Sequence, residues 1–214
     1  MRKKEEEFKK MKKIKRIMVA LMICLMTGCG EKEVLESVQE LEGQKYQITN
    51  KETDNVLLEL TDERKILLEL YPDVAPITVK NFKKLVKEDF YDNLIFHRVV
   101  KDFVIQAGDG TSQGKSASTI KGEFAKNGVK NDLKHERGVL SMARTSVDKN
   151  SASSQFFIML EDNASLDGDY AAFGRVIKGL ETVDSIGKMM VDKNDKPLKD
   201  TTIKRMEFVR LNNE

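Results

Sequence analysis

The most informative part of this chain is FHRVVKDFVIQAGD at residues 96–109. Its apolar residues form two short runs on either side of Lys101 and Asp102, a pattern typical of two β-strands joined by a turn. About fifty residues later, SQFFI at 154–158 provides another apolar run. The two stretches carry an arginine, two glutamines and several aromatic rings. Together they predict a cationic hydrogen-bond donor beside an apolar pocket.

Other segments extend this pattern in both directions along the chain. They are VAPITVKNF at 74–82, GVLSMA at 138–143, LDG at 166–168 and FGRV at 173–176. In this order the segments resemble the cyclophilin family of peptidyl-prolyl isomerases, and the resemblance covers roughly residues 54–211. It implies a mainly β fold, in which a closed eight-stranded antiparallel β-barrel is capped by two α-helices.

The hydrophobic pattern supports the same fold class. Helical spacing predicts one helix at 75–86, with Pro76 in the first turn, where proline is tolerated, and a second helix at 180–187. Many short strands with two helices favour a closed antiparallel barrel. The predicted strands are a hairpin of 56–60 and 65–70, followed by 95–99, 104–107, 138–142, 155–160, 172–176 and 202–211.

The charge distribution separates the N-terminus from the rest of the chain. The 214 residues carry a net charge of +2, but the first 28 hold nine Lys or Arg and only three acidic residues. The remainder has 28 basic and 32 acidic residues, a net charge of −4. A mildly acidic domain argues against nucleic acid as the main partner.

Residues 1–28 are predicted to be a lipoprotein signal peptide. Basic residues at 12–16 precede an apolar run at 17–26, which is far shorter than the about twenty residues that a membrane span needs. The tetrapeptide MTGC that ends at Cys29 resembles a bacterial lipobox, with cleavage before Cys29 and lipidation of its thiol. The alternative is an unmodified thiol in a discarded signal. We expect residues 29–53 to be a flexible tether and 54–214 to be the isomerase domain, held by the lipid on the extracytoplasmic face of the cell membrane.

The implied reaction is rotation about the peptide bond before proline. Amide resonance gives this rotation a barrier near 20 kcal/mol. In the twisted state the proline nitrogen regains a lone pair, so a donor aimed at that nitrogen stabilises only the transition state. The resemblance assigns this role to Arg98, and the reaction requires no nucleophile, metal or cofactor. By the same resemblance, the substrate-binding residues are Phe103, Val104, Gln106, Ala143, Arg144, Gln155, Phe157, Leu166 and Tyr170.

Each assignment has a purely structural alternative. Arg98 could be a surface ion-pair residue, the apolar residues could be ordinary core, and Gln106 and Gln155 could be satisfied buried amides. Alternation along a strand favours the core for Phe156 and the pocket for Phe157. His97 and His135 invite a metal site, but two histidines without a spacing pattern are weak support for one.

Three positions depart from the family pattern. Val104 replaces a methionine, which would leave the pocket slightly less filled. Arg144 replaces an asparagine and brings a charge that would favour acidic residues near the substrate proline. Ser165 replaces a tryptophan that contacts cyclosporin, so we expect weak or no binding of that drug, because an apolar wall and an N–H donor are lost.

We expect proline-containing polypeptides to be the partners and the domain to be a monomer. Two other function classes stay open. One is a proline-peptide binding module or chaperone with little turnover. The other is a structural or solute-binding surface lipoprotein, which would need a large cleft.

Overall fold

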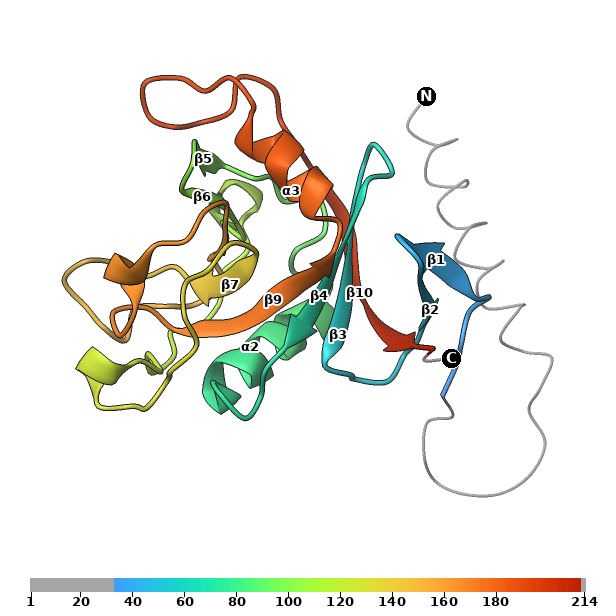
Figure 1. Cartoon of the computed structure of the whole chain (residues 1–214), viewed down its shortest axis with the longest axis horizontal. Coiled ribbons are helices and arrows are strands. Elements are labelled where there is room, and N and C mark those ends of the chain that lie inside the picture. The colour runs from blue at the N-terminus through green and yellow to red at the C-terminus, as the bar shows by residue number, and fades with distance from the viewer. Residues whose placement is uncertain (1–32, 213–214) are drawn as a thin grey trace. The chain divides into compact units, whose positions relative to one another are not determined.

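The computed structural model describes residues 33–212, and a single antiparallel sheet dominates them (Figure 1). The helices are α2 (Pro76–Lys87) and α3 (Leu180–Gly187), with short 3₁₀ turns at η1 (Thr111–Gln113), η2 (Ala125–Asn127) and η3 (Ala164–Leu166). The strands are β1 (Gln39–Leu41), β2 (Gln44–Ile48), β3 (Asn55–Leu60), β4 (Lys65–Leu70), β5 (Arg98–Val100), β6 (Val104–Ala107), β7 (Val139–Met142), β8 (Phe156–Met159), β9 (Ala172–Lys178) and β10 (Ile203–Leu211).

The β3–β4 hairpin shows why apolar runs form strands here. Its register pairs Val56 with Leu68, and Leu60 closes the turn by donating its N–H to the Arg64 carbonyl (2.9 Å). Alternate residues such as Val56 and Leu68 enter the main core, whereas Leu57 belongs to a second apolar cluster on the other face. Because both faces of this hairpin are covered, its sequence is nearly continuous in apolar residues.

The fold is mainly β with two α-helices, as predicted, but the expected closure of the sheet into a barrel is not confirmed. The strand order is β1-β2-β10-β3-β4-β9-β7-β8-β6-β5, which leaves β1 and β5 as edges. The segment before β5 does reach the start of β10, where Asn93 donates to the Ile203 carbonyl (2.8 Å) and Phe96 to that of Thr201 (3.0 Å). This contact is a single isolated bridge at Ile95 and not a ladder.

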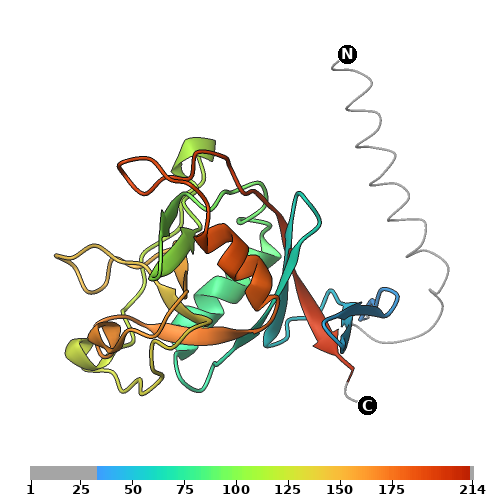
Figure 2. The ribbon, with the colours of Figure 1, turned by 45° about the horizontal axis from the view of Figure 1, so that its top comes forward.

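The two predicted helices are present at the predicted places. In Figure 1 they lie at opposite ends of the curved sheet, and the turn to Figure 2 brings α3 in front of α2. The buried face of α2 includes Val79 and Phe82, at the helical spacing that predicted it. A buried carboxylate, that of Glu123, accepts the N–H groups of Ile77 (3.0 Å) and Thr78 (2.8 Å), so it caps the first turn of α2.

The predicted flexible tether at 29–53 does not hold for residues 39–48. Strands β1 and β2 form a hairpin within it, and β2 pairs with β10 through Ile48 and Val209. Tyr46 and Ile48 are buried against Leu57 and Val209, so this short hairpin gains from tertiary packing the stability that it would lack alone. The folded domain therefore begins before residue 54.

The other N-terminal predictions lie outside the described residues. These include the signal peptide at 1–28 and the lipidation of Cys29. Neither α2 nor α3, the two α-helices within 33–212, has the length and apolar character to cross a membrane.

Candidate active site

A pocket of about 140 Å³ lies beside the four strands β5, β6, β8 and β7. Nine of the ten substrate-site residues predicted from the sequence line it. They are Arg98, Phe103, Val104, Gln106, Ala143, Arg144, Phe157, Leu166 and Tyr170. The fold therefore brings together residues that span more than seventy positions of the chain.

The polar side of the pocket is a chain of three side chains. Arg98 on β5 is the register partner of Gln106 on β6, and its Nη1 donates to Gln106 Oε1 (3.3 Å). Gln106 Nε2 then donates to Gln155 Oε1 (2.8 Å). The tenth predicted residue, Gln155, does not line the pocket and is connected to it through this bond. The neutral Gln106 amide, between Arg98 and Gln155, holds the guanidinium in place without cancelling its charge.

Sequence reasoning missed a second partner of the arginine. Asp195, in the loop between α3 and β10, places Oδ2 3.5 Å from Arg98 Nε. The backbone of Asp195 is in the left-handed region (φ 63°), and its carbonyl accepts the Val99 N–H (2.8 Å). No spacing signal links two residues this far apart in the chain, so only the folded structure could find this contact.

The apolar side of the pocket is built around Phe157. Its ring meets Tyr170 edge to face, with centroids 5.8 Å apart. Phe156, the next residue along β8, belongs to the main core instead, so strand alternation separates the two rings as expected. Phe157 thus forms the floor of the pocket, and the loop that carries Leu166 and Tyr170 forms its wall.

Arg144 lines the pocket beside Tyr170. Its side chain is only 10% exposed, and its guanidinium carbon is 4.6 Å from the centroid of the Tyr170 ring and 5.2 Å from that of Phe124. Nε also donates to the Asp169 carbonyl (3.0 Å). These contacts make the arginine a structural support for Tyr170, and its predicted attraction for acidic substrates stays a prediction.

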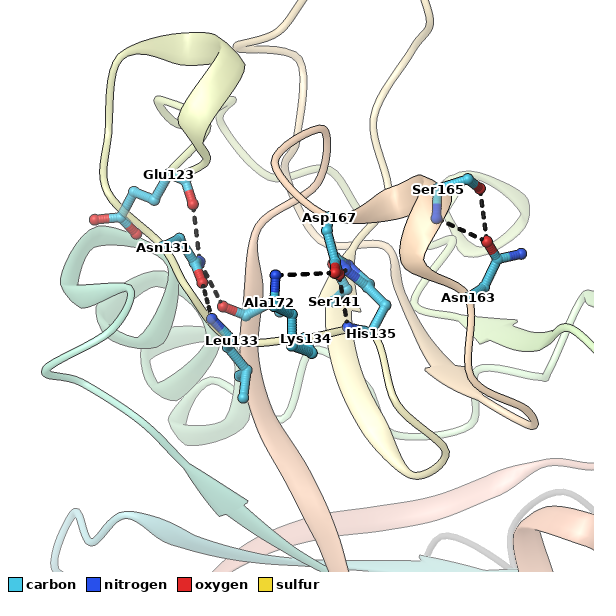
Figure 3. Close-up of polar contacts among 10 residues, drawn as sticks. All are labelled: Glu123, Asn131, Leu133, Lys134, His135, Ser141, Asn163, Ser165, Asp167 and Ala172. Atoms are coloured by element: carbon cyan, nitrogen blue, oxygen red, sulfur yellow. Dashed lines mark hydrogen bonds and ion pairs between the residues drawn. The ribbon is translucent and has the colours of Figure 1, made fainter.

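The two histidines have different surroundings. Burial lowers the pKa of His97, and the Arg98 charge adds to this effect, whereas Asp109 and Gln155 oppose it. His135 is almost fully buried, and its ring contacts Asp167 and Ser141 (Figure 3). Burial lowers its pKa as well, although Asp167 acts in the opposite direction. Within residues 33–212, no three His, Cys, Asp or Glu side chains gather in a way that could hold a metal ion.

Comparison with known proteins identifies the family to which this chain belongs. The model of the family described as "Cyclophilin type peptidyl-prolyl cis-trans isomerase/CLD" matches residues 55–208, which include every residue of the pocket. The chain belongs to the cyclophilin family.

Two eukaryotic members of the family are similar to it in sequence. The peptidyl-prolyl cis-trans isomerase ppi1 of Schizosaccharomyces pombe is 45% identical over 135 residues, which cover 63% of this chain and 86% of that protein. The peptidyl-prolyl cis-trans isomerase-like 1 of Neurospora crassa is 43% identical over 144 residues, covering 67% of this chain and 87% of that protein. The match therefore extends over most of the length of these cyclophilins.

A solved cyclophilin shares the fold. The crystal structure of a Cryptosporidium parvum cyclophilin-type isomerase in the presence of the dipeptide Ala-Pro has a TM-score of 0.64 and 33% sequence identity. The match covers 72% of this chain and 97% of that cyclophilin. The folded domain described above thus corresponds to an entire cyclophilin domain, with the β1–β2 hairpin preceding the part that the family model matches.

Proposed function

We propose that this isomerase accelerates rotation of X-Pro bonds by aiming an N–H group of Arg98 at the proline nitrogen. The observation that carries the proposal is the Arg98–Gln106–Gln155 chain beside the apolar pocket. The proline nitrogen accepts a hydrogen bond only when the amide is twisted, so this donor binds the transition state better than the ground state. An acceleration of about 10⁵ would require roughly 7 kcal/mol of such differential binding.

The remaining residues would bind the substrate. Phe103, Val104, Phe157 and Leu166 would enclose the proline ring in an apolar site. Gln106 and Gln155 would keep Arg98 oriented and hold the carbonyl before proline. The N–H of Ala143 already donates to the Gln155 carbonyl (2.9 Å), so an extended substrate would use the Ala143 carbonyl and the Arg144 N–H. No covalent intermediate forms in this mechanism.

The test is cis/trans exchange of an Ala-Pro peptide measured by NMR, with the full chain in mild detergent. Arg98→Ala should lower kcat by about 10²- to 10³-fold, the range seen when one preorganised transition-state donor is removed. Arg98→Lys should recover only part of this loss, because an ammonium lacks the planar fork. Arg64→Ala is the matched control, since Arg64 forms an exposed ion pair with Asp62 outside the pocket lining.

Two results would overturn this mechanism. Undiminished exchange by Arg98→Ala would exclude Arg98 as the catalytic donor. Slow exchange by the folded parent, together with peptide binding, would favour the alternative of a proline-peptide binding module or chaperone.

We further propose that the enzyme is a lipoprotein that assists folding of exported proteins at the extracytoplasmic membrane surface. The support is the basic segment 12–16, the apolar run 17–26 and the lipobox-like tetrapeptide that ends at Cys29. Cells grown with radiolabelled fatty acid should label the parent and a Cys24→Ser control, but not Cys29→Ser. Label on Cys29→Ser would contradict the proposal.

A further inference from the structure

We infer that His135 is a positioning residue of the proline pocket, because one buried imidazole ties the aromatic floor to the loop that forms the wall. This inference rests on the proposed use of the pocket as the proline site. His135 does not line the pocket itself. Its effect would pass through Phe157 on one side and through the loop of residues 163–170 on the other.

The hydrogen bonds of the ring define its orientation. Nδ1 is 3.1 Å from Asp167 Oδ1, and Nε2 is 3.0 Å from Ser141 Oγ (Figure 3). Burial raises the pKa of Asp167, but hydrogen bonds from His135 and the charge of Lys134 outweigh this and hold it below its ordinary value. An ionised carboxylate can only accept, so the proton lies on Nδ1, and Nε2 accepts the Ser141 hydroxyl.

The same ring supports the floor of the pocket. It stacks on Phe157, with centroids 6.1 Å apart and planes 21° apart. Ser141 on β7 is the register partner of Phe157 on β8, so the hydroxyl that fixes the imidazole comes from directly beside the floor residue. Any tilt of the imidazole would therefore be transmitted to Phe157, because close-packed interiors leave little room to absorb it.

The other side of the network holds the wall. Asp167 Oδ1 also accepts the backbone N–H of His135 (2.9 Å), and the His135 carbonyl accepts the N–H of Asn163 (2.8 Å). Asp167 follows Leu166 directly, and the Tyr170 N–H donates to the Leu166 carbonyl (3.2 Å). Asp167 and Asn163 thus anchor the loop to His135 at two points. Leu166 is next to Asp167 in the chain, and Tyr170 is hydrogen-bonded to Leu166.

The segment before His135 is itself anchored. Asn131 Nδ2 donates to the carbonyls of Glu123 (2.9 Å) and Ala172 (2.8 Å), and Asn131 Oδ1 accepts the Leu133 N–H (3.2 Å) (Figure 3). These bonds fix the segment against the start of β9. His135 therefore reaches the network from a fixed backbone, which a positioning residue requires.

A distorted pocket would bind the proline ring less well in the ground state and the transition state alike. Such a loss raises KM and leaves kcat nearly unchanged. The Arg98–Gln106–Gln155 chain, on β5, β6 and the residue before β8, shares no hydrogen bond with His135, so the catalytic donor would keep its place. This KM-against-kcat split distinguishes positioning of the pocket from loss of the donor.

The experiment uses the full chain in mild detergent and measures KM and kcat by NMR exchange over a range of Ala-Pro peptide concentrations. Asp167→Ala should raise KM about tenfold and change kcat less than about twofold. Asp167→Asn keeps an oxygen for both His135 donors, so it should restore KM to within about twofold of the parent. Ser141→Ala, a smaller change that removes one hydrogen bond, should raise KM about threefold.

Glu59→Ala is the matched control, because Glu59 is another buried carboxylate, bonded to Lys204 and Arg205 and outside the pocket lining. It should lower the midpoint of unfolding without raising KM. An unchanged KM in folded Asp167→Ala, or in Ser141→Ala if the first variant does not fold, would overturn the inference. An equal rise of KM in Glu59→Ala would overturn it as well.

Peptide titration separates this inference from the proposed mechanism. If the parent binds the Ala-Pro peptide but does not catalyse exchange, the role of Arg98 fails. The positioning role of His135 would then still be decided by the peptide Kd of the same four variants.

Discussion

Loss of the Gln106 side chain should lower kcat more than loss of Asp195, although both residues contact Arg98. Gln106 Oε1 accepts from Nη1 at 3.3 Å, and Asp195 Oδ2 lies 3.5 Å from Nε. A net hydrogen bond to a charged group contributes about 1.5 to 3 kcal/mol, and the long Arg98–Gln106 distance favours the lower value. The Asp195 pair is 40% and 43% exposed at its two side chains, so solvent screening limits it to about 0 to 1 kcal/mol.

We therefore expect Gln106→Ala to reduce kcat about tenfold, which corresponds to about 1.4 kcal/mol. Asp195→Ala should reduce it less than about fivefold. The assay is NMR exchange of an Ala-Pro peptide at saturating concentration. Gln113→Ala serves as the control, since the side chain of this exposed glutamine donates to the Asn93 carbonyl and lies outside the pocket lining. A folded Gln106→Ala enzyme with kcat within twofold of the parent would refute the orienting role of the amide.

Tyr46→Ala should cost about 3 to 5 kcal/mol in the free energy of unfolding by urea, because Tyr46 is fully buried; a loss below about 0.5 kcal/mol would instead support a tether. Nanomolar cyclosporin should leave exchange uninhibited, because Ser165 provides no indole wall, and Ser165→Trp should strengthen inhibition; nanomolar inhibition of the parent would contradict this. Peptides with Glu beside proline should turn over faster than those with Lys, because Arg144 is cationic. The difference should be modest, since Arg144 is only 10% exposed, and equal rates would exclude the proposed charge preference. Burial lowers the pKa of His97 and His135, so the unfolded chain binds more protons than the folded one. The free energy of unfolding should therefore fall as pH drops below about 6.5. A His97→Gln chain with the same pH dependence as the parent would contradict this.

Much of the fold could be read from local pattern. The β3–β4 hairpin, the helix α2 and the strand β6 lie where apolar runs bounded by turn residues, or helical spacing, predict them, because each depends on residues close together in the chain. The hairpin at residues 39–48 was missed for the opposite reason. Its stability comes from Tyr46 packing on β3, β4 and β10, which lie elsewhere in the sequence.

The side chains that line the pocket could be identified from the sequence and its family resemblance. Arg98 and Gln106 lie on two strands joined by a short turn, so their spacing already sets them opposite each other. The family resemblance supplied Phe157, Leu166 and Tyr170, and the structure places them around the same space.

The contacts that hold the pocket in place could not be identified in this way. Asp195 reaches Arg98 from a distant loop, and His135 meets Asp167 and Ser141 inside the domain. Such contacts depend on how separate elements pack and on which polar atoms burial forces to find partners. Residue spacing along one strand or helix does not predict such contacts.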